Sequence, residues 1–108
     1  MSVLPVLEAA IRAQAPIRFR YVRDGKTSGV RVGDPHCVYM ERLIDGSERV
    51  YIDVWQTGGA SDSGKPLPSW RRCFLDGITD VEVMSDEAPF DVCDSYNPTY
   101  YEYPICKI

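Results

Sequence analysis

The spacing of apolar residues near the start of the chain is that of a helix. Four apolar residues lie three or four positions apart, so they share one helix face. They are Leu4, Leu7, Ala10 and Ile11. Pro5 suits the first turn of a helix, where its missing N–H costs nothing, and Pro16 cannot continue one. The pattern predicts one amphipathic helix over residues 4–14.

After Pro16, apolar and polar residues alternate, which is the pattern of strands with one buried face. Asp-Gly pairs, which favour tight turns, separate these stretches. The pairs are Asp24-Gly25, Asp45-Gly46 and Asp76-Gly77. The predicted strand segments are residues 17–21, 29–42 (interrupted at Asp34-Pro35), 50–55, 70–75 and 78–84. One helix followed by five short antiparallel strands predicts a mainly β (α+β) fold, a small and strongly bent five-stranded barrel.

Two segments lack a strand period. Residues 56–69 are rich in Gly, Ser and Pro, which predicts an irregular loop. Within it, Gly59–Lys65 has the spacing of a phosphate-binding loop, but Pro66 follows the lysine. The hydroxyl and the helix that such a loop needs are therefore missing, and nucleotide hydrolysis is not expected. The sequence of residues 86–108 predicts an extended segment that lies on the barrel, and we call this segment the arm.

The size and composition of the chain fit a single globular domain. It has 108 residues, of which 44% are hydrophobic and 26% charged. We expect one domain, 1–108, made of the helix, a barrel over residues 16–85 and the arm. No apolar run approaches the roughly 20 residues that span a bilayer. Glu8 and Arg12 interrupt the first apolar stretch, so we expect no signal peptide, a cytoplasmic location and no membrane contact.

The acidic excess of the chain lies in the arm. Residues 1–85 carry 11 basic and 11 acidic side chains, whereas residues 86–108 carry five acidic residues and one basic residue, Lys107. This balance argues against nonspecific binding of duplex DNA, which needs a net basic face. It leaves room for a local basic site, and arginine, the better bidentate partner for phosphate or carboxylate, is the prevalent basic residue.

The cysteine pattern does not predict a metal site. The four cysteines are Cys37, Cys73, Cys93 and Cys106. They include no C-x-x-C pair, which zinc sites commonly use, so no metal and no cofactor are expected. Single cysteines on strands are usually small buried apolar residues, and we expect these to be reduced.

His36 is the single histidine, so any triad would have to be built around it. The chain has no G-x-S-x-G motif and no carboxylate pair at a telling spacing. A histidine that follows a proline beside a strand is more often a hydrogen-bonding structural group than a base. We therefore expect no enzymatic activity, and an enzyme built on His36 is kept as a minor alternative.

Three arginines lie in strand-like segments rather than loops: Arg31, Arg71 and Arg72. They are either surface charges on a half-exposed sheet or part of an anion site at the mouth of the barrel, with His36 and Tyr21 beside them. Alternation separates two faces. Arg71, Cys73 and Leu75 share one, and Trp70, Arg72 and Phe74 share the other. Both faces contain apolar residues, so alternation alone does not orient them.

Four stretches in a fixed order resemble the WYL domain family. They are Pro16–Tyr21, Arg31–His36, Arg49–Ile52 and Arg71–Ile78. They match that family's F-x-Y strand, its R-x-x-x-P segment, its Trp-Tyr-Leu strand and its closing strand, and together with the helix they cover about residues 7–84. The chain departs from the family at three sites and in a longer 56–69 loop. Val50-Tyr51-Ile52 replaces Trp-Tyr-Leu, Cys73 replaces the usual Phe, and Gly77 replaces the usual Arg.

The resemblance implies an Sm-like barrel, of the Src-homology-3 type, that senses a ligand in bacterial transcription regulators. The ligands proposed for that family are nucleotides or short single-stranded nucleic acid. The positions that match its basic and aromatic site residues are Tyr21, Arg31, His36, Tyr51 and Arg71. Rings stack on bases and arginines fork onto phosphates. One helix leaves no room for a helix-turn-helix. We therefore expect a stand-alone, non-catalytic module that binds an anionic small molecule, a nucleotide or a nucleic-acid fragment.

The second hypothesis is a protein–protein interaction module that uses the arm and needs no ligand. The arm carries Tyr96, Tyr100, Tyr101 and Tyr103. Aromatic residues are enriched at interfaces, so the arm would dock onto the barrel, onto a second copy in a homodimer or onto another protein. The hypotheses differ at Arg71. A ligand site places Arg71 in a concave pocket with Arg31 or His36 within reach of one anion. A structural role places it in a salt bridge with Asp53 or Glu82.

Overall fold

The chain begins with the helix that its apolar spacing predicts. The computed structural model describes residues 2–22, 29–61 and 66–108. In it, α1 spans Leu4–Ala13, and three residues of the predicted apolar face are buried. The helix ends at Gln14, whose left-handed backbone (φ 51°) turns the chain towards Pro16.

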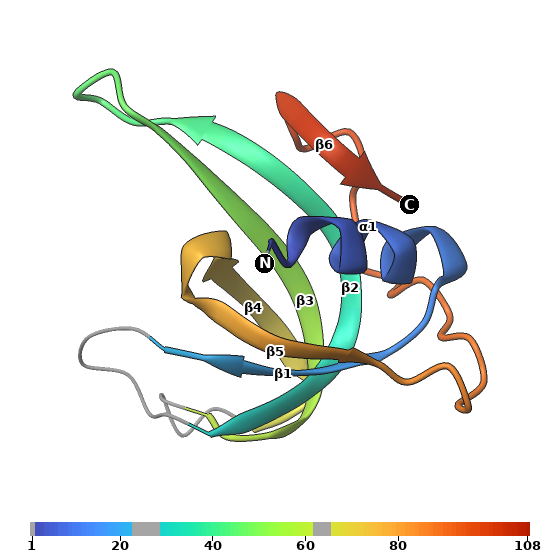
Figure 1. Ribbon diagram of the computed structural model, residues 1–108. Helices are drawn as coiled ribbons and strands as arrows, with labels where there is room; N and C mark the ends of the chain where they lie inside the picture. The colour runs from blue at the N-terminus through green and yellow to red at the C-terminus, as the bar shows by residue number, and fades with distance from the viewer. Residues whose placement is uncertain (1, 23–28, 62–65) are drawn as a thin grey trace.

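Six antiparallel strands follow and form one open sheet (Figure 1). They are β1 (Ile17–Tyr21), β2 (Val30–Arg42), β3 (Glu48–Gly59), β4 (Ser69–Phe74), β5 (Ile78–Val83) and β6 (Tyr103–Lys107). Five strands lie in the order β4-β3-β2-β1-β5, and β6 pairs with β2. A short 3-10 turn, η1 (Leu75–Gly77), joins the two end strands of this order. The predicted mainly β class and the leading helix are confirmed, and the sheet is open.

The prediction that residues 29–42 are interrupted at Asp34-Pro35 is wrong, because β2 is continuous. A proline inside a sheet normally removes a ladder hydrogen bond. Here β1 pairs with β2 as far as Gly33, and β6 pairs with it from Cys37. Pro35 therefore lies in the gap between these two neighbours on one edge of β2, while β3 pairs with it on the other edge.

A bulge at His36 sets the two faces of β2. β3 pairs with Pro35 and then with Cys37, so His36 is an extra residue in β2. Because of this extra residue, Val38 faces the same side as Pro35, and Cys37 faces the other side. We call the side that packs against α1 the inner face, and the opposite side the outer face.

Both faces of the central strands are covered by apolar residues. The main core, on the inner face, consists of Leu7, Ala10, Ile11, Ile17, Phe19, Tyr21, Val38, Ile52, Val54, Cys73, Ile78 and Cys106. A second, smaller cluster on the outer face consists of Cys37, Tyr39 and Tyr51. Tyr96 and Tyr101 of the arm pack against this second cluster. The arm therefore covers the outer face, as α1 covers the inner one.

The predicted irregular loop over residues 56–69 is wrong in its first part, because β3 continues to Gly59. Gly58 and Gly59 pair with Val32 and Arg31 of β2. Gly59 has a positive φ of 88°, and its missing side chain allows the backbone of β2 to approach closely. The glycines thus permit a close strand contact, although they resemble breakers in the sequence.

The turns agree with the Asp-Gly pairs where the structure describes them. Asp45-Gly46 forms the β2–β3 turn, closed by a hydrogen bond from the Leu43 amide to the Ser47 carbonyl. Asp76-Gly77 lies in η1, which leads β5 away to pair with β1 and not with β4. The predicted Asp24-Gly25 turn, and the end of the segment that resembles a phosphate-binding loop, lie outside the described residues.

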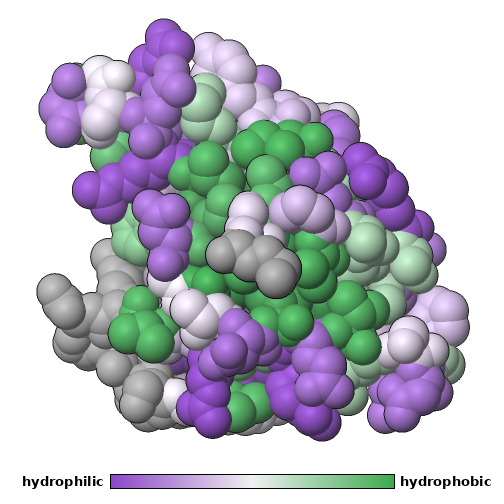
Figure 2. All heavy atoms as spheres, viewed as in Figure 1, coloured by the Kyte–Doolittle hydropathy of each residue, from purple (hydrophilic) through white to green (hydrophobic). Residues whose placement is uncertain are grey.

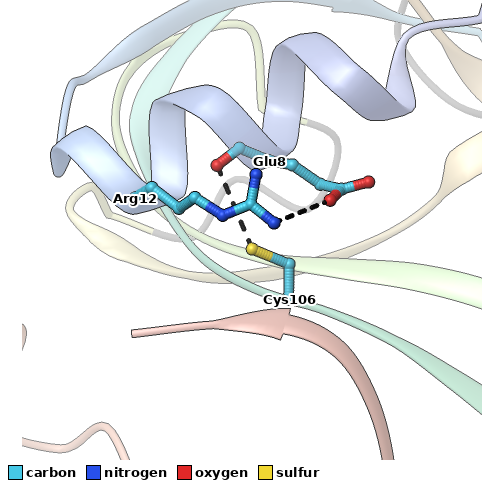
Figure 3. Close-up of polar contacts among 3 residues, drawn as sticks. All are labelled: Glu8, Arg12 and Cys106. Atoms are coloured by element: carbon cyan, nitrogen blue, oxygen red, sulfur yellow. Dashed lines mark hydrogen bonds and ion pairs between the residues drawn. The ribbon is translucent and has the colours of Figure 1, made fainter.

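The arm forms a strand that its sequence did not predict. Residues 103–107 make β6, which pairs antiparallel with residues 37–40 of β2. Cys106 of this strand is buried, and its thiol points at the carbonyl of Glu8 in α1, 3.9 Å away (Figure 3). Arg12 pairs with the carboxylate of the same Glu8 at 3.1 Å. The end of the chain is thus fastened to both the sheet and the helix.

The helix covers the hollow side of the bent sheet. In Figure 1, α1 crosses in front of the strands, and in the same view apolar side chains gather over the middle of Figure 2 with hydrophilic ones around them. A shallow groove lies between the start of the chain and β5, and its walls include Val3, Val6 of α1, Ile78 and Val81.

Replacing Gly59 by alanine is expected to destabilise the protein by more than about 1–2 kcal/mol. The positive φ alone costs about that much for a residue with a side chain, and the new Cβ would also collide with the Val30 carbonyl oxygen. Gly58→Ala is the matched control, because a Cβ there would lie 4.0 Å from its nearest neighbour, in Val32. Urea denaturation of both variants checks this, and equal midpoints would contradict it.

Candidate functional site

The first two predicted site residues, Tyr21 and Arg31, lie together on the inner face. Both are buried, and Arg31 has 1% of its surface exposed. Its guanidinium carbon lies 5.4 Å from the centre of the Tyr21 ring, within the range of a cation–π contact. The Tyr21 hydroxyl accepts a hydrogen bond from the Phe74 amide at 3.0 Å. An arginine and a ring are therefore held side by side on the inner face.

Arg71 reaches the inner face from β4. It pairs with Val54, a core residue, and is half-buried. Its Nη2 donates to the Ser61 hydroxyl at 2.7 Å. Ser61 comes two residues after Gly59, and Gly59 pairs with Arg31. The side chain of Arg71 and the backbone of Arg31 thus lie near the same end of β3.

A buried glutamine supports this end of the sheet. Gln56 is 0% exposed, and its Nε2 donates to the carbonyls of Gly58 (3.0 Å) and Ala60 (2.6 Å). These bonds fix the backbone that leads to Ser61, whose hydroxyl accepts the hydrogen bond from Arg71. Within the described part of the chain, the Gln56 Oε1 has no hydrogen-bond partner. Buried polar atoms normally have a hydrogen-bond partner, so the Gln56 Oε1 is an unused hydrogen-bond acceptor.

The described contacts of Arg71 do not include either predicted salt bridge. Glu82 pairs with Arg18 at 3.5 Å. Asp53 lies on the outer face, opposite Arg72, because Arg71 and Arg72 alternate. Cys73 lies in the main core, so Arg71, which shares its face of β4, is on the inner face. Arg72 pairs with Asp53 and is on the outer face. Alternation alone did not decide between these orientations.

His36 lies on the outer face, away from Arg31 and Arg71. Its Nε2 accepts the Cys93 amide at 3.1 Å, so the proton must be on Nδ1, which donates to the Asp34 carbonyl at 2.8 Å. The ring is 0% exposed and packs against three aromatic rings, those of Trp70, Phe90 and Tyr96. Burial lowers the pKa of His36, more than the hydrogen bond to Asp34 raises it. In this environment the histidine fastens the arm to β2.

Tyr51, the last predicted site residue, is also on the outer face. It is buried and stacks on Tyr39, with ring centres 5.8 Å apart. The Arg72 guanidinium lies 3.9 Å from the centre of the Tyr51 ring and forms an ion pair with Glu41. The structure therefore groups Tyr21, Arg31 and Arg71 on one face, and places His36 and Tyr51 on the other.

Asp53 is the outer-face residue whose importance the sequence did not reveal. Two tyrosine hydroxyls donate to its carboxylate, Tyr39 at 2.9 Å and Tyr101 at 2.8 Å. Burial raises the pKa of Asp53 above its ordinary value, although these hydrogen bonds act in the opposite direction. Burial also raises the pKa values of Tyr39 and Tyr101 and raises that of Tyr96 to about 12, so all three hydroxyls stay protonated at neutral pH. The signal in the sequence is slight: a carboxylate that shares one strand face with Tyr51 and Trp55.

Neither a metal centre nor a membrane span is found in the described part of the chain. No group of three or more His, Cys, Asp or Glu side chains is placed to hold a metal ion there. None of the described helices is long and apolar enough to cross a membrane. Comparison with known proteins gave no matching family model, no matching curated protein and no matching solved structure.

Asp34→Asn is expected to stabilise the protein at neutral pH. Burial raises the pKa of Asp34 from 3.8 to about 6, so ionising this carboxyl costs stability, and the cost grows between these two pH values and is complete above pH 6. Full shielding would make this roughly 3 kcal/mol. Because the residue is only half-buried, we expect about 1 kcal/mol at pH 7.5. Chemical denaturation of wild type and variant should show no difference near pH 3.5.

Asp45→Asn is the control with the opposite sign. Hydrogen bonds from Ser47 hold the pKa of Asp45 below its ordinary value, so its ionised form stabilises the fold above pH 4. Its replacement should lower stability at pH 7.5. Stabilisation by both variants, or by neither, would refute the assignment of the Asp34 shift to burial.

Proposed function

We propose that this protein is a non-catalytic binding module that holds an anionic ligand through Arg31 and Arg71, with the Tyr21 ring beside them. The ligand class is a nucleotide or a short single-stranded nucleic acid. One observation carries the proposal: Arg71 of β4 donates to Ser61, two residues after the Gly59 that pairs with the buried Arg31 of β2, and both arginines are on the inner face. Guanidinium groups suit a phosphate, and an aromatic ring beside one of them suits a base.

The arrangement of strands supports the finer fold and family that accompany this proposal. We propose an Sm-like barrel of the WYL type, acting in the regulation of transcription. The order β4-β3-β2-β1-β5, with a 3-10 turn between β4 and β5, is what such a barrel needs to bring its two end strands together. The family usually has Arg at the position of Gly77, but in this chain a side chain there would collide with neighbouring backbone. A Cβ there would lie 2.8 Å from the Val22 carbonyl oxygen.

His36 and Tyr51 are left out of the proposed site. Both nitrogens of His36 are used in hydrogen bonds that hold the arm, and Tyr51 is covered by Arg72. The proposal therefore rests on three of the five residues that the family resemblance suggested.

The alternative, an interaction module that uses the arm, is supported by fewer side chains than its sequence suggested. Tyr96 and Tyr101 pack on the sheet. Tyr100 and Tyr103, which are 68% and 40% exposed, remain available to a protein partner or a second copy. If no anion raises the melting temperature and the protein dimerises through these residues, the alternative replaces the proposal.

Arg71→Ala is expected to weaken anion binding by about ten-fold or more, the usual worth of a charged hydrogen bond. Its effect on melting temperature should be small, because the described contact that it removes is a single hydrogen bond to Ser61. Thermal-shift titrations with nucleoside phosphates and a short oligothymidine, repeated at high salt, measure both quantities.

Arg72→Ala is the matched control, because it removes the same charge from the next residue and from the other face. It should keep the affinity for these probes and lose some stability with its contacts to Tyr51 and Glu41. A destabilised Arg71→Ala protein with unaltered affinity would defeat the proposed site.

A further inference from the structure

A small pocket with aromatic walls lies between the outer face and the arm. Its volume is about 210 Å³, below the roughly 300–1,000 Å³ of sites for drug-sized ligands, so it suits a single small head group. Four rings and one carboxylate dominate its lining. They are Trp70, Tyr96, Tyr100, Tyr101 and Asp53.

The rings of this pocket face in different directions. Tyr96 lies 6.2 Å from Trp70 and 6.2 Å from Tyr101, at interplanar angles of 37° and 38°. Tyr100 lies 5.4 Å from Tyr101 at 87°. All four rings line the pocket. The face of an aromatic ring carries partial negative charge and therefore attracts cations.

Hydrogen bonds hold most of this wall in place without a ligand. The Trp70 indole donates to the Ser95 hydroxyl at 2.8 Å, and the Tyr101 hydroxyl donates to Asp53. Tyr96 packs against the buried ring of His36 at 5.0 Å. Tyr100, by contrast, is 68% exposed. Three walls are preorganised, and the fourth is at the surface, where it would contact an incoming group.

The charge around the pocket is negative. In the sheet, Asp53 and Glu41 lie opposite Arg72 and Arg49, so these four groups balance and the negative excess comes from the arm. A carboxylate has about four lone-pair sites, and the two tyrosine hydroxyls occupy two of those on Asp53. The surrounding segment, residues 86–108, adds five acidic residues against Lys107.

We propose that this pocket binds an alkylated ammonium group, the head group of a choline-like amine or of a methylated lysine side chain. Such a cation gives up little hydration, contacts ring faces through its methyl groups and needs no strong hydrogen-bond acceptor. The Asp53 carboxylate supplies the countercharge at the floor of the pocket. This site is on the opposite face of the sheet from Arg31 and Arg71, and it does not depend on the function proposed for them.

Calorimetric titration with choline chloride tests the proposal, with tryptophan fluorescence as a second readout because Trp70 lines the pocket. We expect saturable binding that equal concentrations of sodium chloride do not reproduce. The uncharged isostere 3,3-dimethylbutanol should bind more weakly. Equal binding of the isostere, or no saturation with choline or with the methylated peptide described below, would overturn the proposal.

Two variants locate the site. Tyr100→Ala should weaken choline binding by about 2- to 5-fold, the worth of an exposed cation–π contact. Tyr103→Ala, which removes a 40% exposed tyrosine of the same arm outside this pocket, should leave it unchanged. Asp53→Asn removes the countercharge and should reduce affinity more than Tyr100→Ala does. Should Asp53→Asn fail to fold, the comparison of the two tyrosine variants decides, and equal affinities would refute the site.

The source of the ammonium group is distinguished by a second titration. A peptide containing trimethyllysine is compared with the unmethylated peptide and with choline. Tighter binding of the methylated peptide assigns the site to a modified protein, and equal binding of choline assigns it to a free amine. Tighter or equal binding of the unmethylated peptide contradicts the proposal, since a plain lysine carries the same charge without the methyl groups.

Discussion

The central constraint on this structure is that β2 is buried on both faces from Pro35 to Tyr39. A strand buried on both sides needs two covering layers. On the inner face the cover is α1 with the core of β1 and β5, and on the outer face it is the arm. The extra residue at His36 lets both requirements be met, because it directs Val38 into the main core and leaves Tyr39 for the arm to cover. Without the bulge, the residues after it would face the opposite sides.

Much of the architecture could be predicted because its signals are local. The apolar spacing of α1 and the alternation along β1 and β4 depend only on neighbouring residues. The bulge, the extension of β3 to Gly59 and the strand β6 depend on partners far along the chain. Gly58 and Gly59 resemble loop residues until the backbone of Arg31 is placed against them. Residues 103–107 have no period of their own, because β6 pairs along one edge with β2 and exposes most of its side chains.

The candidate sites also combine features that local sequence predicts with features that depend on distant partners. Alternation separates Arg71 from Arg72 in the sequence, but only the position of Cys73 in the core shows which of them faces inward. His36 is satisfied by a backbone amide 57 residues away, which no motif reveals. Asp53 gains its role from tyrosines 14 and 48 residues away. Single residues whose environment is assembled from distant segments carry no pattern that a sequence can display.

The two faces of the sheet also carry different charged residues, and the register between β3 and β4 determines which residue lies on which face. Arg31 and Arg71 are on the inner face. On the outer face Asp53 and Glu41 are balanced by Arg72 and Arg49, and the arm adds the acidic excess. Consecutive residues of β4 serve both sides, Arg71 inward and Arg72 outward. A slip of one residue between β3 and β4 would exchange them, bring a charge into the main core in place of Cys73 and remove the partner of Glu41. Because burial on both faces penalises that slip, the packing of the core fixes that Arg71 faces inward and Arg72 outward.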